Sequence, residues 1–347
     1  MRLLATSFLV TTLLVLLVGC ENDPTPPKPD VNKLHGKTMG TTYSITYRDS
    51  LGQDFKPEVN SLLQAINQEV STYIKDSKIS VFNTSETLEL EKTTEHFVRN
   101  FNRAKEIYQK SNGWFNPTVM PLVNYWGFGY TEKRAVEDVD SSIVDSLVQL
   151  VVFDSIQLSD AGEKWLVQKT NAAIQLDFSA IAKGDAVDAI GLLLEKKGIV
   201  SYVVEIGGEV RARGKTPKGY PWRAGINVPS EDAALNELQA AIELKQKSLA
   251  TSGNYRNFHE VNGQKYAHTI NPQTGYPEKN RLLSASVIAE NCATADAFAT
   301  AFMAMGLDKA WVLVNQLPEV EAYFIYSDEN GAFQTKHSEG LNEALLD

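Results

Sequence analysis

The sequence has few of the residues that build disulfide frameworks and thiolate metal sites. Only two cysteines, Cys20 and Cys292, occur in 347 residues, which excludes a disulfide scaffold and a zinc site made of clustered thiolates. Positive charge is also in the minority, because 33 Lys and Arg stand against 43 Asp and Glu and the formal net charge is −10. A phosphate backbone would be repelled on average, so we expect no nucleic-acid partner.

Long hydrophobic runs are missing as well, apart from one at the N-terminus. Residues 3–18 follow Arg2 and have the composition of an export signal, but they are fewer than the roughly 20 residues that a membrane span needs. The run ends at Leu17-Val18-Gly19-Cys20, which resembles the lipobox of bacterial lipoproteins. We expect residues 1–19 to be a signal peptide and Cys20 to carry the lipid that anchors an exported protein to a bacterial membrane. An ordinary cleaved signal followed by a chance cysteine is the alternative.

A tether and one folded body are expected after the signal. Residues 20–33 are rich in proline and polar side chains, so they should form an extended linker that does not pack. Residues 34–347 show no second break in composition and no repeat, and 43% of the whole chain is hydrophobic, enough for a substantial core. We therefore expect a single domain over 34–347.

The pattern of elements favours the α+β class, with mixed, largely antiparallel sheets packed with helices, because strands outnumber crossover helices. A tight strand-to-strand turn is expected at Gly207-Gly208. Apolar spacing predicts helices over residues 57–73, 97–108, 143–151, 182–196 and 293–305. Short alternating or apolar runs predict strands over residues 42–47, 174–178, 202–206, 222–227, 240–244, 266–270 and 285–289.

Two common nucleotide-binding signatures can be excluded. Gly36-Lys37-Thr38 looks like the end of a phosphate-binding loop, but that motif needs a glycine five residues before Gly36, where this chain has Val31. No Gly-x-Gly-x-x-Gly sequence opens a helix after a strand either, which excludes a Rossmann dinucleotide site.

A carboxylate and an ammonium flank the start of the helix expected at 182–196. Asp177 ends the preceding strand, and Lys183 lies at the helix N-terminus, where exposed backbone N–H groups also favour an anion such as a pyrophosphate. A plain surface salt bridge between the two explains the pattern equally well.

Asp296, Thr300 and His268 are three further candidates. Asp296 and Thr300 are four residues apart, so they share one face of the helix expected at 293–305 and offer two oxygen ligands to a hard cation such as Mg²⁺. Alternatively, Asp296 interacts favourably with the helix dipole, and the Thr300 hydroxyl forms a hydrogen bond with the backbone of its own helix. A lone histidine is more often structural, but His268 lies where a strand meets a turn, a common place for functional residues.

Together these segments resemble the family of FAD:protein FMN transferases, flavin transferases first described as thiamine-biosynthesis lipoproteins. Each motif is weak alone, but their joint occurrence in this order is specific. In chain order they are Lys37-Thr38-Met39-Gly40-Thr41, Ser71-Thr72-Tyr73, Ser80-Val81-Phe82-Asn83, residues 113–119, residues 121–129, residues 177–184, Gly207-Gly208, residues 250–255, residues 268–275 and the helix that carries Asp296.

The resemblance implies an enzyme that takes FAD and uses Mg²⁺. Such enzymes join the FMN half of FAD, through a phosphoester bond, to a threonine hydroxyl of an acceptor flavoprotein and release AMP; the usual acceptor is a membrane respiratory subunit. The resemblance implies that Mg²⁺ is held by Asp296, Thr300 and the backbone carbonyl of Ala180, and that His268 assists removal of the hydroxyl proton. The FAD contacts that it implies are Met39, Tyr73, Trp114, Phe115, Asn116, Asp177, Lys183 and Ile270.

Two other functions remain open at this point. In the first, water replaces the threonine and the chain is a pyrophosphatase that cuts FAD to FMN and AMP. In the second, the chain is a tethered lipoprotein that binds flavin without turnover. Asn116 and Asn271 favour the second, because many relatives carry aspartate at both places and this chain has less negative charge there.

Overall fold

One long antiparallel sheet organises the molecule. The computed structural model describes residues 31–131, 139–229, 237–254, 258–261, 264–267, 269–278 and 281–346. Each neighbouring pair in the sheet is antiparallel. Its eight strands lie in the order β1 (Val31–Thr38), β2 (Thr41–Arg48), β6 (Tyr202–Ile206), β7 (Glu209–Arg213), β10 (Ser248–Gly253), β13 (Leu282–Ala289), β14 (Val320–Ser327) and β15 (Phe333–His337).

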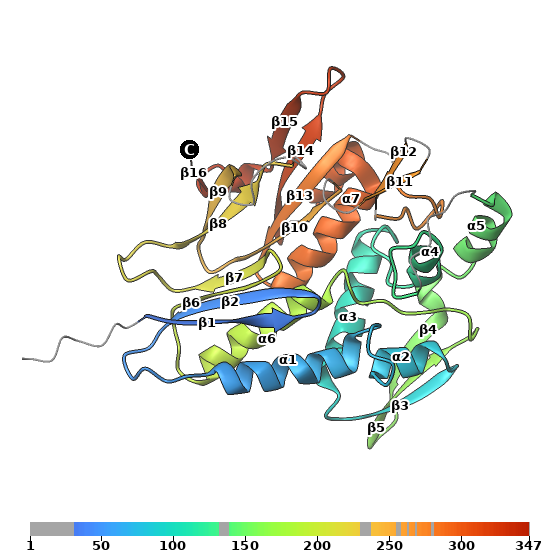
Figure 1. Cartoon of the computed structure of the whole chain (residues 1–347), viewed down its shortest axis with the longest axis horizontal. Helices are drawn as coiled ribbons and strands as arrows, with labels where there is room; N and C mark the ends of the chain where they lie inside the picture. The colour runs from blue at the N-terminus through green and yellow to red at the C-terminus, as the bar shows by residue number, and fades with distance from the viewer. Residues whose placement is uncertain are drawn as a thin grey trace, which may run out of the picture.

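Helices and smaller sheets surround the long sheet (Figure 1). The smaller antiparallel sheets are β16 (Leu345–Leu346) with β9 (Leu238–Leu244) and β8 (Trp222–Asn227), β3 (Thr87–Glu91) with β5 (Lys164–Lys169) and β4 (Ile156–Asp160), and β11 (Phe258–Val261) with β12 (Gln264–Ala267). The helices are α1 (Lys56–Val70), α2 (Lys78–Asn83), α3 (Glu95–Lys110), α4 (Met120–Tyr125), α5 (Ser141–Val148), α6 (Ala182–Lys196) and α7 (Cys292–Val314), with single 3₁₀ turns at Phe153–Ser155 and Glu339–Leu341.

Both faces of the long sheet are buried. Side chains alternate between the faces of a strand, so Val287 in β13 joins the main core with α6 and α7, while its neighbour Ile288 joins a second core. The sheet of β16, β9 and β8 covers that second face, with Ile226 and Ile242 buried beneath it. A third, small cluster lies between α4, α5 and the turn that follows Ile270.

Helix α7 is the core helix of this arrangement. By length and composition it could cross a membrane, but 61% of its most apolar window is buried inside the fold, and it packs against α3, α6, β10 and β13. Gly306 breaks its regular geometry, with φ 73° and ψ 168°, which a side chain would disfavour. The half of α7 before Gly306 carries Asp296 and Thr300.

The structure confirms the α+β class and most of the expected elements. The prediction of α6 matches at both ends, as do those of β6 and β8. Gly207 and Gly208 form the β6–β7 turn with φ values of 61° and 106°, as a tight hairpin turn requires. Gly36 lies in β1 opposite Tyr43, and its missing side chain makes room for the tyrosine ring rather than for a phosphate.

Several expectations need correction, among them the helix expected at 143–151, which ends at Val148. The strand expected at 174–178 does not form: Leu176 exchanges two hydrogen bonds with the side chain of Asn83, at 2.7 and 2.8 Å, instead of joining a ladder. The first helix ends at Val70, so Tyr73 lies outside it. Residues 31–33, expected in the tether, pair with β2 and therefore belong to the folded body.

Lys169, at the end of β5, is expected to make stability depend on pH. Its ammonium is buried and donates to the carbonyl oxygens of Asn83 and Ile174 at 3.2 and 2.6 Å. Burial lowers the pKa of Lys169 from 10.5 to about 8, against a smaller opposite effect of the Glu86 charge. Between these values the unfolded chain binds more protons than the folded one, so stability should rise with pH by up to about 3 kcal/mol.

Urea unfolding at about pH 7.5 and about pH 10 tests this prediction. The Lys169→Met variant should lose the part of the rise that comes from this lysine, since it has no proton to release. An equal rise in both proteins would show that Lys169 is not the group responsible.

Candidate functional site

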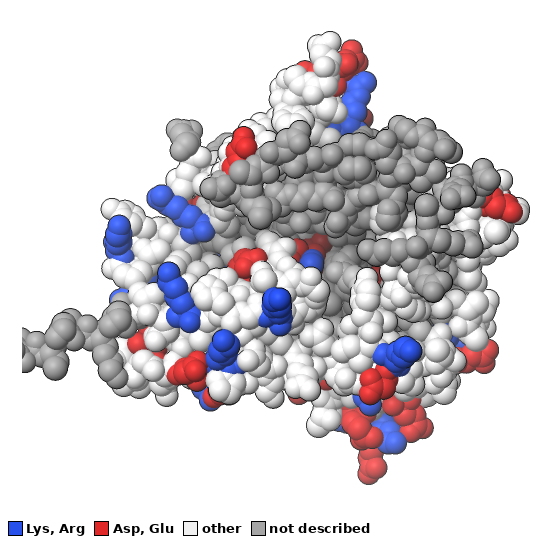
Figure 2. Space-filling view, in the orientation of Figure 1, with Lys and Arg blue, Asp and Glu red and all other residues white. Residues whose placement is uncertain are grey.

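A cavity of about 670 Å³ lies where several loops meet the N-terminal halves of α6 and α7. This volume is within the usual range for small-molecule sites. Figure 2 shows oppositely charged side chains close together in a hollow near the centre of one face. The cavity is lined from α6 by Lys183, from α7 by Asp296, Thr300 and Ala304, from β7 by Glu209, from β10 by residues 251–253, and from loops by Tyr73, residues 114–117, Asp177, Ser179, Ala180, Thr269 and Ile270, among others.

Three charged groups form a compact cluster in the cavity wall. The Lys183 ammonium lies 2.9 Å from Glu209 Oε1 and 3.7 Å from Asp296 Oδ1. Burial lowers the pKa of Lys183, but the charges of Asp296 and Glu209 outweigh it, so the pKa is raised overall and the lysine stays charged. Burial raises the pKa of Glu209, and Asp296 adds to the rise, against the attraction of Lys183. The cluster is therefore rich in carboxylates that would be stabilised by a further positive charge.

The donor set around Asp296 fits a magnesium ion. Thr300 presents its hydroxyl one helical turn further along α7, 3.2 Å from the Ser252 hydroxyl, and Ala180 lines the same cavity. Glu209 Oε2 is buried without a hydrogen-bond partner. Within the described ranges, no group of three or more His, Cys, Asp and Glu residues is placed so that it could hold a metal ion by itself. Mg²⁺ suits such a place, because it is usually held by one or two carboxylates together with substrate phosphates and water.

The other walls offer polar and aromatic surface. Asp177 is half-buried and accepts hydrogen bonds from the backbone N–H and hydroxyl of Ser179 at 2.9 and 2.6 Å; burial raises the pKa of Asp177 overall. Tyr73 is 67% exposed at the rim, with Tyr130 edge-on to it at 6.5 Å. Trp114 is partly buried, and the ammonium of Lys309, which lines a separate surface hollow with it, lies 4.3 Å from its ring centre. Exposed aromatic faces of this kind can stack on flat rings.

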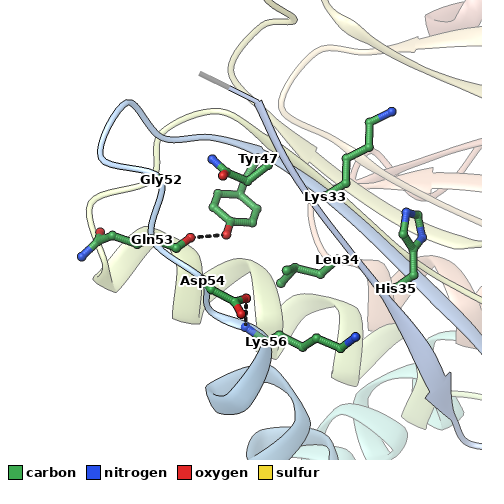
Figure 3. Close-up of a pocket in the computed structure, with 9 residues that line it drawn as sticks. Lys33, Leu34, His35, Tyr47, Gly52, Gln53, Asp54 and Lys56 are labelled. Carbon is green, nitrogen blue, oxygen red and sulfur yellow. Dashed lines mark hydrogen bonds between the residues drawn. The ribbon is translucent and has the colours of Figure 1, made fainter. Parts of the chain in front are cut away.

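A second cavity, of about 350 Å³, lies at the edge of the long sheet and lacks such a cluster (Figure 3). The Tyr47 hydroxyl donates to the Gln53 carbonyl at 2.5 Å, and Asp54 accepts the backbone N–H of Lys56 at 2.9 Å. Lys33 and His35 point away from Tyr47 in this view. Its described lining shows no ammonium set between carboxylates, so the central cavity is the better candidate for chemistry.

A comparison with protein families identifies the family of this chain. The model of the ApbE family matches residues 39–324, which is most of the chain. This chain belongs to the ApbE family. The resemblance inferred from the ordered motifs is thereby confirmed.

Similar proteins and similar solved structures are named as flavin transferases. The chain is 33% identical to a FAD:protein FMN transferase of Haemophilus influenzae over 99% of its own length and 98% of the relative's, and 36% identical to one of Vibrio cholerae over 88% and 90%. Among solved structures, it is similar to the flavin transferase ApbE of Vibrio cholerae, with a TM-score of 0.79, 33% identity and coverage of 90% of this chain and 99% of that one. The apo flavinyl transferase ApbE of Pseudomonas stutzeri gives a TM-score of 0.79 at 30% identity, over 90% and 96% of the two chains.

Most of the candidate residues of this ApbE-family chain meet at the central cavity. Ten of the residues that sequence analysis singled out line it: Tyr73, Trp114, Phe115, Asn116, Asp177, Ala180, Lys183, Ile270, Asp296 and Thr300. Phe115 is only 2% exposed, so much of its ring belongs to the core. Met39 is not in the described lining; it occupies the β1–β2 turn with φ 48° and packs against the main core. His268 and Cys20 lie outside the described residues.

Glu209 is the main residue that sequence analysis missed. Nothing local distinguishes this glutamate, which opens β7 directly after the Gly207-Gly208 turn. Its importance follows from its place opposite Lys183, which depends on how α6 packs against β7.

The two amides Asn116 and Asn271 have clear structural roles. Asn116 Oδ1 accepts from the backbone N–H and hydroxyl of Thr118, at 3.0 and 2.7 Å. Asn271 Oδ1 accepts the backbone N–H of Gln273 at 2.9 Å, and its amide donates to Glu278 Oε2 at 2.9 Å. An aspartate at 271 would face the Glu278 carboxylate, so the amide matches its own surroundings. Neither amide replaces a member of the charged cluster.

Proposed function

We propose that this chain is a Mg²⁺-dependent FAD:protein FMN transferase. It would transfer the FMN part of FAD to a threonine hydroxyl of an acceptor flavoprotein and release AMP. The observation that supports this most strongly is the cluster of Lys183, Asp296 and Thr300 in one cavity. An ammonium and a seat for a divalent cation, side by side, are what the cleavage of a diphosphate requires.

In the proposed reaction, the threonine oxygen of the acceptor attacks the phosphorus of the FMN half. The bond from that phosphorus to the bridging oxygen breaks, and AMP leaves with the oxygen. Lys183 offsets the negative charge that develops on the phosphates, and Asp296 and Thr300 hold the metal. When bound, Mg²⁺ supplies Lewis-acid polarisation of the phosphoryl oxygens. His268 takes the hydroxyl proton, as the family resemblance implies.

The cavity walls would bind the rest of FAD. Tyr73 and Trp114 supply aromatic faces for a flat ring system, and Asp177 and Asn116 supply polar side chains in the same cavity. Ile270 belongs to the small third core and would press an apolar surface against the ligand. Met39 would contribute only from the β1–β2 turn that it occupies.

The proposal includes a cellular location. A signal at 1–19 and a lipid on Cys20 would anchor the domain to a bacterial membrane, facing the periplasm or another extracytoplasmic space, with the segment from Cys20 to the start of β1 as tether. The acceptor would then be a membrane respiratory subunit that exposes its threonine on the same side.

Mass spectrometry tests the proposed function. The chain is incubated with FAD, Mg²⁺ and a candidate acceptor, and an FMN mass on a threonine, with one AMP released per adduct, is the expected result. FMN and AMP formed equally well without an acceptor would instead show a pyrophosphatase. Bound FAD with no AMP under saturating Mg²⁺, while a control transferase is active, would show a flavin-binding lipoprotein.

A further inference from the structure

Helices α6 and α7 cap each other's N-termini. The Asp188 carboxylate, from α6, accepts the first two backbone N–H groups of α7: Oδ1 accepts from Cys292 and Oδ2 from Ala293, both at 3.0 Å. In return, Asp296 Oδ2 of α7 accepts the backbone N–H of Gly184, in the first turn of α6, at 3.1 Å. These N–H groups have no partner within their own helices.

The cap of α7 comes from outside the helix. Asn291 occupies the N-cap position, where a residue of its type usually binds the first turn with its own side chain, but it makes no such bond here. Asp188 therefore supplies the capping hydrogen bonds that the N-cap residue itself normally supplies. Its carboxylate also places negative charge at the positive end of the α7 dipole.

The two helices approach too closely for a side chain at their crossing. A Cβ atom at Gly184 would lie 2.5 Å from the Cys292 carbonyl oxygen and 2.6 Å from Ala293 Cα. Because these are backbone atoms of α7, the helix itself would have to move. The start of α7 is thus held by contact with Gly184 and by the hydrogen bonds to Asp188.

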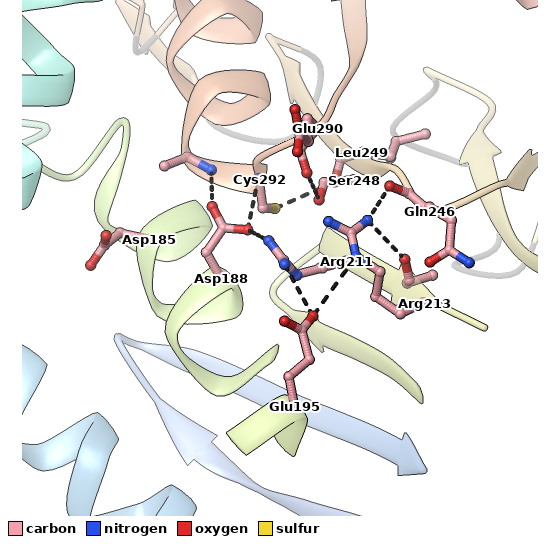
Figure 4. Close-up of polar contacts among 12 residues, drawn as sticks. Asp185, Asp188, Glu195, Arg211, Arg213, Gln246, Ser248, Leu249, Glu290 and Cys292 are labelled. Carbon is pink, nitrogen blue, oxygen red and sulfur yellow. Dashed lines mark hydrogen bonds and ion pairs between the residues drawn. The ribbon is translucent and has the colours of Figure 1, made fainter. Parts of the chain in front are cut away.

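Asp188 is in turn held from the long sheet, as Figure 4 shows. Arg211 of β7 donates to Asp188 Oδ1 at 2.7 Å, to the Tyr202 hydroxyl at 3.0 Å and to Glu195 Oε1 at 3.2 Å. Asp188 and Arg211 are both buried, at 8% and 5% exposure. Helix α7 is therefore tied through one carboxylate to both α6 and the sheet.

We propose that Asp188 is a positioning residue for the metal site at Asp296 and Thr300. Asp296 lies one helical turn after the two N–H groups that Asp188 caps, so any fraying or shift of that turn would move its carboxylate. The inference rests on the proposed role of Asp296 and Thr300 in holding Mg²⁺. Asp188 lines no part of the described cavity, so its effect would reach the metal only through α7.

The test replaces Asp188 with asparagine, which has the same shape but loses the charge and one acceptor oxygen. In Asp188→Asn we expect the dissociation constant for Mg²⁺, titrated into the FAD-loaded chain by calorimetry, to rise about tenfold, as changes to the supports of metal ligands commonly cause. The KM for FAD should stay within about twofold, because Asp188 does not line the cavity.

Asp185→Asn is the matched control. Asp185 is also a buried carboxylate of α6 that pairs with an arginine, since it accepts from Arg99 Nη2 at 2.8 Å, but its partners lie on α3. Its loss should lower the melting temperature comparably while leaving the Mg²⁺ dissociation constant within about twofold. An unchanged Mg²⁺ affinity in Asp188→Asn, or an equal weakening in both variants, would overturn the proposal.

If Asp188→Asn does not fold, a milder variant, Arg211→Lys, tests the same proposal. Arg211→Lys keeps the positive charge beside Asp188 but cannot reach its three acceptors at once, so the cap should loosen. A weaker Mg²⁺ affinity with unchanged FAD affinity is expected. Unchanged binding of both would contradict the proposal. Calorimetry reports on the metal site whether or not the chain transfers FMN, so failure of the proposed function would be recognised separately.

Discussion

Replacing Asp296 with alanine is expected to lower the Mg²⁺-dependent rate of FMN transfer by about 10³-fold or more, which corresponds to about 4 kcal/mol of transition-state stabilisation. Asp296 is the carboxylate that lies within 3.7 Å of Lys183 and shares a face of α7 with Thr300. Without it, the metal would lose its main charged ligand. The readout is the initial rate of adduct formation across a Mg²⁺ titration, together with the rise in melting temperature that bound Mg²⁺ causes in the FAD-loaded chain.

Two further variants separate the metal role of Asp296 from its structural role. Asp296→Asn keeps an oxygen for the Gly184 N–H, so it should fold almost as stably as the parent and still lose the Mg²⁺ response. Asp308→Ala removes an exposed carboxylate from the same helix and should leave the rate unchanged. Transfer at the parent rate in Asp296→Asn would remove this carboxylate from the mechanism.

Much of the fold follows from local patterns in the sequence. Helix α6 was predicted to the residue, because its apolar spacing and its flanking residues agree, and the β6–β7 turn followed from two adjacent glycines. The order of strands in the long sheet did not follow. The pairing of β7 with β10, for example, joins residues far apart in the chain and is decided by packing.

The segment around Leu176 shows why a local pattern can mislead. Its alternation of buried and less buried residues is typical of a strand. However, the side chain of Asn83 satisfies both polar groups of Leu176, so no neighbouring strand is needed. Such a partner is 93 residues away and leaves no periodic trace in the sequence.

The sequence predicts several residues of the candidate site, but not the contacts between elements that bring them together. Lys183, Asp296 and Thr300 were found because helix spacing and residue chemistry single them out. Glu209 and Asp188 were not, because each gains its role from a contact between elements: β7 with α6, and α6 with the start of α7. Helix-to-helix capping of this kind depends on a close crossing that one sequence does not reveal.

Lys183 should be nearly as important to the rate as Asp296. In Lys183→Met the side chain keeps about its length and apolar stem but loses the ammonium that faces Glu209 and Asp296. We expect kcat to fall by about 10²-fold to 10³-fold, as when one charge-stabilising donor is removed from other active sites. FAD binding should weaken too, since the diphosphate would meet two carboxylates without their counter-ion. Stopped assays of AMP release and calorimetry with FAD measure the two effects.

Lys309→Met provides the control for Lys183→Met, because this lysine also lies close to the cavity wall. Its ammonium lies over the Trp114 ring at 4.3 Å and belongs to the wall of a separate surface hollow with Asn112 and Met305. Removing its charge should change kcat by less than about twofold, since the field of an exposed cation is screened by water. If both variants slow the reaction equally, the effect is general electrostatics rather than a contact of Lys183 with the diphosphate. If only Lys183→Met is slow, the ammonium acts where the phosphorus–oxygen bond breaks, and the charge cluster in the wall is catalytic.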